Sequence, residues 1–213
     1  MSLSQIKVRR KPQQSRARLT QEALIESFVQ LLKEKDSTEI TIREITDIAG
    51  VGLGTFYEYF SKKEDLIALT IHQYIKNNAN TIKQQATLWM MDVSQTPINR
   101  ESLQNLIEYL LQAQISDIQS EQKIWAQLFL LERQISSPKA YQKHYALMIQ
   151  SWNQALSAFT QSTESNLSLN IHRISYGFIS QTLLVNSDFQ NWKNLYQDML
   201  EMIQFFILKT QKI

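Results

Sequence analysis

The stretch "AGVGLGTFYEYF", residues 49–60, decides the fold of this 213-residue chain. It holds three of the four glycines in the sequence and continues into a run of aromatic side chains. The segment before it, "TIREITDIAG", places Ile42, Ile45 and Ile48 on one helical face behind a Thr41 cap, which predicts a short helix. The segment "LGTFYEYF" predicts a second one, so the glycines lie in the turn of a helix-turn-helix.

Each glycine has a separate mechanical reason in this interpretation. Gly50 can adopt the positive φ that ends a helix, and Gly52 then caps the next helix. A phosphate-binding loop is excluded, because the dinucleotide pattern needs a preceding strand and a glycine where Thr55 stands. Without side chains at Gly52 and Gly54, the helix start can approach a phosphate or a base edge closely.

The second short helix has an apolar face and an outward face. Phe56 and Phe60 are four residues apart, so we expect them in the core. We expect Tyr57 and Tyr59 to face outward with Leu53, Thr55 and Glu58, where tyrosines suit phosphates and thymine methyl groups. The alternative is that either tyrosine packs on the adjoining helix.

Positive charge is concentrated at the N-terminus, although the net charge of the chain is only +2. Residues 1–20 contain six Lys or Arg and no acidic residue, and such an arm typically binds a polyanion, a solvated tail being the alternative. We expect Arg16 and Arg18 to be the best ordered of these charges and to reach an adjacent minor groove.

Apolar residues recur at intervals of three and four along the rest of the chain, which predicts an all-α fold. We expect a small three-helix domain over residues 20–65, after a basic arm at 1–19, and a larger helical bundle over 66–213. Further helix starts are indicated by Ser61-x-x-Glu64 and Ser187-x-x-Gln190, and by proline after a cap at Thr96-Pro97 and Ser137-Pro138.

The run "TIREITDIAGVGLGTFYEYFSKKEDL", residues 41–66, resembles the DNA-binding signature of the TetR family of bacterial transcriptional repressors. The resemblance implies that the helix after the glycines enters the major groove and that the larger domain dimerises and binds a small-molecule inducer. It also implies DNA contacts at a specific set of positions: Thr41, Arg43, Leu53, Thr55, Tyr57, Tyr59 and Lys63, the last holding a phosphate. Gly52 stands where the family often has serine, and Glu58 where it often has a basic or polar residue.

The second part of the chain contains all four tryptophans, and aromatic side chains of this kind line pockets for flat or apolar ligands. Packing in the core is the alternative for each of them. The candidate ligand-binding residues are Trp89, Trp125, Phe129, Tyr145, Trp152 and Phe178. By resemblance, two long helices at about 168–186 and 189–209 would form the homodimer interface.

These observations favour a ligand-responsive repressor that binds a palindromic operator in double-stranded DNA. A regulator that lacks an inducer, or an activator, stays open. A helical enzyme or carrier is a distant alternative, because the chain has no cysteine and no His-x-x-x-His or Glu-x-x-His motif. We expect no metal and no cofactor, and a cytoplasmic protein without a membrane-spanning segment.

Overall fold

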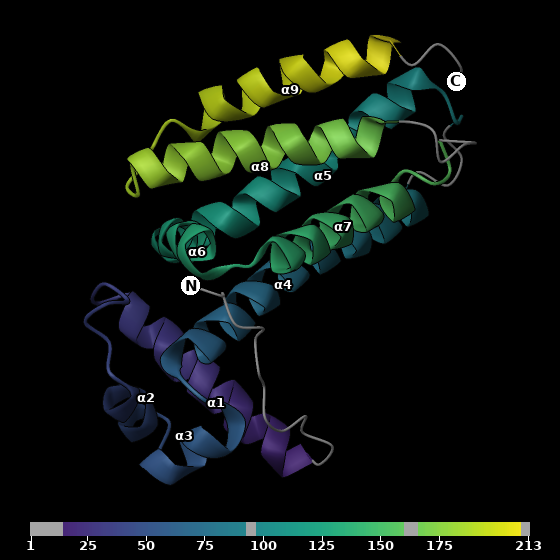
Figure 1. Cartoon of the computed structure of the whole chain (residues 1–213). Coiled ribbons are helices and arrows are strands. Elements are labelled where there is room, and N and C mark those ends of the chain that lie inside the picture. Colours follow the sequence, from purple (N-terminus) through teal and green to yellow (C-terminus); the bar gives the residue numbers. More distant parts are fainter. Residues whose placement is uncertain (1–14, 93–96, 160–165, 210–213) are drawn as a thin grey trace. The chain divides into compact units, whose positions relative to one another are not determined.

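The computed structural model describes residues 15–92, 97–159 and 166–209, which are helical almost throughout and contain no strand (Figure 1). The all-α prediction is therefore confirmed. Within these ranges the helices are α1 (Ser15–Leu32), α2 (Ile42–Ile48), α3 (Leu53–Tyr59), α4 (Lys63–Asp92), α5 (Arg100–Ser120), α6 (Gln122–Ile135), α7 (Pro138–Ala155), α8 (Leu167–Val185) and α9 (Trp192–Lys209).

The chain forms two compact units that are discontinuous in sequence. Unit 1 comprises residues up to Tyr74 together with Lys123–Tyr141, and unit 2 comprises Ile75–Gln122 and Gln142–Ile213. Helix α6 therefore belongs with the N-terminal helices, although it lies far along the sequence. Two contacts explain this: the Gln127 side chain donates a 2.7 Å hydrogen bond to the Leu32 carbonyl at the end of α1, and the Trp125 ring meets Tyr74 edge-on.

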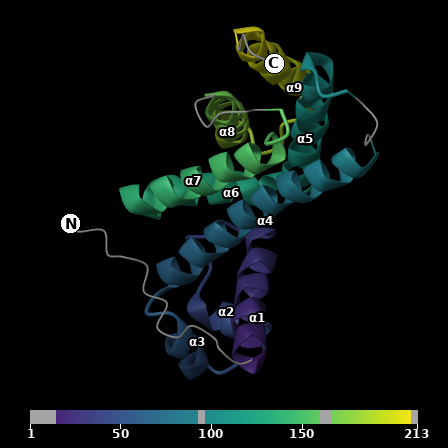
Figure 2. The same cartoon turned by 90° about the vertical axis from the view of Figure 1, so that its right-hand side faces the viewer.

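The core of unit 1 fixes the positions of α2 and α3. Helix α1 contributes the fully buried Leu24 and Phe28 and packs against α2, whose Ile45 is also fully buried. Helix α3 is held by Phe56, and Phe60 follows it directly, both with no exposed surface, as predicted. Figure 2 shows α2 and α3 grouped beside α1. Because α2 and α3 have only seven residues each, this packing has to supply most of their stability.

Some predicted helix starts are confirmed and others are wrong. Helix α7 begins at Pro138, and the Ala140 amide donates to the Ser137 hydroxyl at 3.2 Å. Helix α4 begins at Lys63, and the Ser61 amide donates to the Asp65 carboxylate, so the predicted Ser61 box is wrong.

The other two starts lie further along the chain than predicted. Asn99 caps α5 through a reciprocal box with Ser102, so Pro97 is not the first helical residue, and Thr96 lies outside the described residues. Helix α9 starts at Trp192 rather than near Ser187, since the Asn186 side chain forms a turn by accepting from the Asp188 amide.

Unit 2 is built around α5, whose apolar face is fully buried from Leu103 to Leu111. Helix α9 packs against both α5 and α8, and α8 and α9 run side by side (Figure 1). In the part of the chain that the structure describes, no helix combines the length and hydropathy needed to cross a membrane.

Candidate nucleic-acid interface

The turn between α2 and α3 has the geometry that the glycine pattern predicts. Gly50 has a φ of 67°, the left-handed conformation, and the Val51 amide donates a 3.0 Å hydrogen bond to the Thr46 carbonyl. Gly52 caps α3 with extended backbone (φ −73°, ψ 151°) and makes no side-chain hydrogen bond. A left-handed residue between the helices reverses the chain within a few residues, so the end of α2 and the start of α3 lie close together.

Only one of these three glycines is required by the protein's own backbone. A side chain at Gly50 would be strained because of its positive φ. A Cβ added at Gly52 or at Gly54 would meet no atom within 4 Å, and neither residue has a positive φ. Nothing inside the molecule excludes a side chain at these two positions, so the bare backbone there faces outward.

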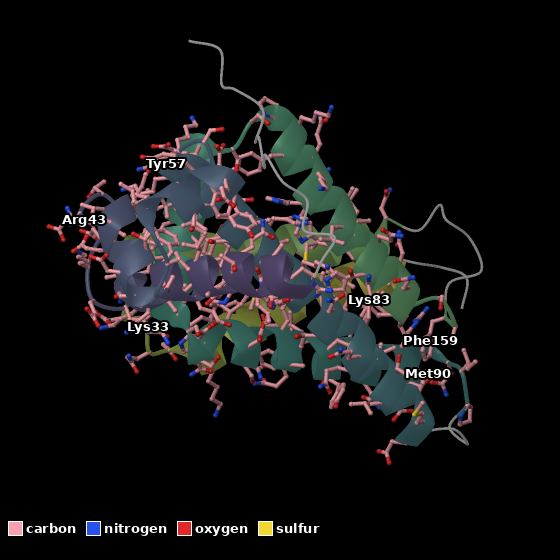
Figure 3. The ribbon with its side chains drawn as sticks, turned by 90° about the horizontal axis from the view of Figure 1, so that it is seen from below. Lys33, Arg43, Tyr57, Lys83, Met90 and Phe159 are labelled. Atoms are coloured by element: carbon pink, nitrogen blue, oxygen red, sulfur yellow. The ribbon has the colours of Figure 1, made fainter. Side chains whose placement is uncertain are left out.

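Arg43 on α2 and Tyr57 on α3 project away from the ribbon (Figure 3). Arg43 is exposed, and although its carbonyl accepts from the Thr46 hydroxyl, its guanidinium has no hydrogen-bond or ion-pair partner among the described residues. The Tyr57 side chain is 43% exposed, and its ring leans edge-on against Phe56 with 5.5 Å between ring centroids. This contact orients the phenol while its hydroxyl stays outside. Leu53 is also exposed, and Thr55 is half-buried.

The prediction that Tyr59 faces outward is wrong. Its side chain is only 4% exposed, and its ring packs beside Phe60 with 6.5 Å between centroids. The reason is that positions 56, 59 and 60 follow the three- and four-residue helical spacing and so share one face. The second α3 tyrosine therefore belongs to the core, which is the alternative that the sequence left open.

Thr41 at the start of α2 forms the predicted capping box. The Glu44 amide donates to the Thr41 hydroxyl oxygen, and the Glu44 carboxylate accepts from both the Thr41 amide (2.9 Å) and the Thr41 hydroxyl (2.8 Å). The Lys35 ammonium lies 2.6 Å from the same carboxylate. The hydrogen bond from Lys35, followed by those from Thr41, lowers the pKa of Glu44 to about 2. Glu44 is therefore ionised at neutral pH, and the Thr41 hydroxyl already donates within the protein.

Lys63 at the start of α4 makes a contact that the sequence did not reveal. Its ammonium donates to the Ser37 carbonyl at 2.8 Å and to the Ile40 carbonyl at 2.7 Å. These carbonyls lie in the connection between α1 and α2, so Lys63 joins the first turn of α4 to that connection. These two bonds use two of the three N–H groups of the ammonium.

We expect Lys63→Met to destabilise unit 1, because it removes both charged hydrogen bonds while keeping the apolar stem. The free energy of unfolding should fall by about 1–2 kcal/mol. This loss is smaller than for fully buried charged hydrogen bonds, because solvent screens the half-exposed Lys63 side chain. Urea unfolding followed by circular dichroism measures this. Lys62→Met, at the exposed neighbouring lysine, is the control and should leave the midpoint unchanged. Equal midpoints for the two variants would contradict a structural role for Lys63.

The two arginines that we expected to be ordered in the basic arm both fall within α1, but the structure describes the side chain of only one of them. Arg18 lies within α1, is exposed, and is 3.7 Å from Glu22 one turn later. Arg16 also falls within α1, but its side chain lies outside the described residues, as does the rest of the arm at 1–14.

The six predicted ligand-binding residues are divided between the two units, and Trp125 with Phe129 is the one pair of them for which the described residues show a ring contact. These two rings lie in unit 1, tilted against each other with 5.4 Å between ring centroids. The other four lie in unit 2. Trp89 contacts Phe159, Tyr145 contacts His172, Trp152 is fully buried, and Phe178 is half-buried on α8.

Sequence reasoning missed one exposed residue at the turn. Ile48, predicted to lie on the buried face of α2, is 44% exposed. It lies on the other side of Gly50 from the exposed Leu53, so two apolar side chains flank the turn. Periodicity assigned Ile48 to the core because it follows Ile45 by three residues, but α2 ends there and its last turn has no neighbour to cover that position.

Comparison with known proteins agrees with this geometry. Residues 24–69 match the sequence profile of the bacterial regulatory proteins, tetR family. The fold of the chain is similar to that of a TetR transcriptional regulator from Rhodococcus sp. RHA1, with a TM-score of 0.62 and 14% identity over 92% of this chain and 100% of that one. A protein assigned to the same family from Syntrophomonas wolfei gives a TM-score of 0.66 and 14% identity over 92% and 98% of the two chains. A search of curated protein sequences found no match.

The matched profile covers α2, the turn, α3 and the start of α4, which are the elements that present Arg43 and Tyr57. The solved structures share the small N-terminal helix-turn-helix domain followed by a larger helical part. Residues 24–69 therefore match the profile of this family, and the chain as a whole has the fold of these TetR regulators.

Proposed function

We propose that this protein is a transcriptional regulator of the TetR family, that it binds a two-fold symmetric DNA operator as a homodimer, and that a small molecule releases it. The observation that carries the proposal is the surface around the turn between α2 and α3. There an unpaired guanidinium, an oriented phenol and the bare backbone of Gly52 and Gly54 all face outward. Arginine binds phosphates or guanine edges, and tyrosine donates to phosphates, so this combination suits a major groove.

The α8–α9 pair supports dimerisation. Helix α9 exposes Met202, Phe205 and Leu208 by 47%, 52% and 63%. These residues are spaced by three and therefore share one side of the helix, and an uncovered apolar surface of this kind typically marks an interface. A second copy would cover it, and the two-fold symmetry of such a contact would place two copies of α3 on one DNA duplex.

Release by a ligand is supported by the shape of unit 2, which contains an open cavity beside the last turns of α4 and α7. A ligand that binds better to one arrangement of the helices shifts the population toward it, and DNA affinity falls if the two α3 helices no longer match successive major grooves. A regulator without an inducer, or an activator, is the alternative.

The experiment that tests DNA binding is selection from a pool of random duplexes with the full chain, followed by sequencing. We expect a two-fold symmetric site whose half-sites lie about one helical turn apart. Phe205→Glu should give a monomer in sedimentation and lose the symmetric enrichment. Gln197→Glu, at an exposed polar position on the same helix, adds the same charge and should stay dimeric. A pool without any enriched sequence would refute the proposal, and an enriched site without symmetry would refute the dimeric part of it.

A further inference from the structure

The cavity in unit 2 has a volume of about 780 Å³ and is open to solvent on one side. Helix α4 contributes Lys83, Ala86, Thr87 and Met90 to its lining, and the end of α7 and the residues after it contribute Ala155 and Ala158. The short side chains of Ala86, Ala155 and Ala158 leave room for the cavity. The volume is in the range typical of small-molecule sites.

One cation sets the charge of this cavity. Among the lining residues that the structure describes, Lys83 is the only charged one, and the acidic residues of α4, which are Glu64, Asp65 and Asp92, lie outside the lining. The Lys83 side chain is half-buried and forms no hydrogen bond or ion pair with any residue that the structure describes. An ammonium without a counter-charge at the edge of a concave surface attracts an anion, and its partial burial reduces screening by solvent.

The rest of the lining toward the end of α4 is apolar or neutral. Met90 and Met91 lie beyond Lys83 on α4, and the neighbouring Trp89 contacts Phe159 with tilted rings and 6.3 Å between centroids. Methionine side chains adapt to flexible apolar groups. From Lys83 to Met91 the helix rises by about 12 Å, at 1.5 Å per residue. The cavity thus offers a positive group at one end and an apolar wall of that length.

We propose that this cavity binds an amphipathic monoanion, with its anionic group on Lys83 and its apolar body along Ala86, Met90 and Met91. Thr87 and the neutral polar residues Gln154 and Ser157 offer further hydrogen bonds to the head group. Binding follows from the charge and shape of the cavity alone. Only its consequence, release of DNA, rests on the proposed function.

The test uses two probes that have the same chain length and opposite charge, decanoate and decyltrimethylammonium, below their micelle concentrations. Their affinities for the full chain are measured by isothermal titration calorimetry in the absence of DNA. Wild-type protein should bind decanoate at least about tenfold more tightly than the cation. Lys83→Met should abolish this preference, and Lys83→Glu should reverse it. Lys193→Met, at an exposed lysine on α9 outside the cavity, should behave like the wild type.

A second variant locates the site independently of charge. Thr87 is exposed on the cavity wall, so Thr87→Trp should fill the cavity without disturbing the core, and should weaken decanoate binding about tenfold or more. Equal binding of both probes to the wild type, or an unchanged decanoate affinity in Lys83→Glu and Thr87→Trp, would overturn the proposal.

A separate measurement adds decanoate to the complex with the selected DNA. If decanoate binds through Lys83 but the complex persists, the site stands and the inducer role fails. If DNA binding itself is absent, the titrations without DNA still decide whether the site exists.

Discussion

Replacing Arg43 with Glu is expected to lower the affinity for operator DNA by about 100-fold. Arg43 is exposed at the start of α2, and its guanidinium has no partner among the described residues, so it is available to a phosphate or a base edge. The substitution removes that contact and places a negative charge against the duplex, and a dimer carries the change twice. Because fewer counterions are then released, the dependence of affinity on salt should also become less steep.

Fluorescence anisotropy with the selected duplex at several salt concentrations measures both effects. Lys139→Glu makes the same charge change at an exposed position of α7, also in unit 1, and serves as the control. Its affinity should fall by less than about threefold, through the general field alone. Similar losses in the two variants would mean that net charge, rather than a contact by Arg43, determines binding.

Phe56→Ala is expected to reduce the free energy of unfolding by about 3–5 kcal/mol. The Phe56 ring has no exposed surface and meets Phe60 at 5.3 Å and Tyr57 at 5.5 Å between centroids. Removing the ring leaves a cavity beneath α3, and a helix of seven residues is not stable in water without such packing. Since a whole domain is stable by only about 5–15 kcal/mol, DNA binding should be lost with the helix.

Urea unfolding monitored by circular dichroism gives the change in free energy. Tyr57→Ala is the matched control, because it removes an aromatic side chain from the next position on the same helix, where 43% of the residue is exposed. We expect it to cost less than about 1 kcal/mol of stability while weakening DNA binding. A small loss of stability for Phe56→Ala would show that the packing of α3 depends on other residues.

The local features of this fold were predictable because they depend on neighbouring residues. The positive φ at Gly50, the Thr41 box and the burial of Phe56 and Phe60 all follow from spacing and backbone chemistry over a few positions. Helix starts failed where another side chain competed for the same amide, as Asp65 does for that of Ser61.

Features that depend on distant parts of the chain were not predictable. Ile48 is exposed because no described element covers the end of α2. The burial of Tyr59, in contrast, follows from its three-residue spacing to Phe56 and was predictable. The bonds from Lys63 to two carbonyls 23 and 26 residues earlier leave no trace in local periodicity. The aromatic residues proposed as a ligand site were selected by residue type alone, without a spacing pattern that links them. In the structure they belong to both units.

The hydrogen bond from Gln127 to Leu32 bears on how hybrid regulators are assembled from this protein and its relatives. A junction placed at the end of α3 would combine α1 with a foreign α6 and leave the Leu32 carbonyl facing an unrelated side chain. Exchanging residues 1–74 together with 123–141 keeps the donor and the acceptor of this bond in the same parent protein. Helices α1–α3 and helix α6 are then transferred together.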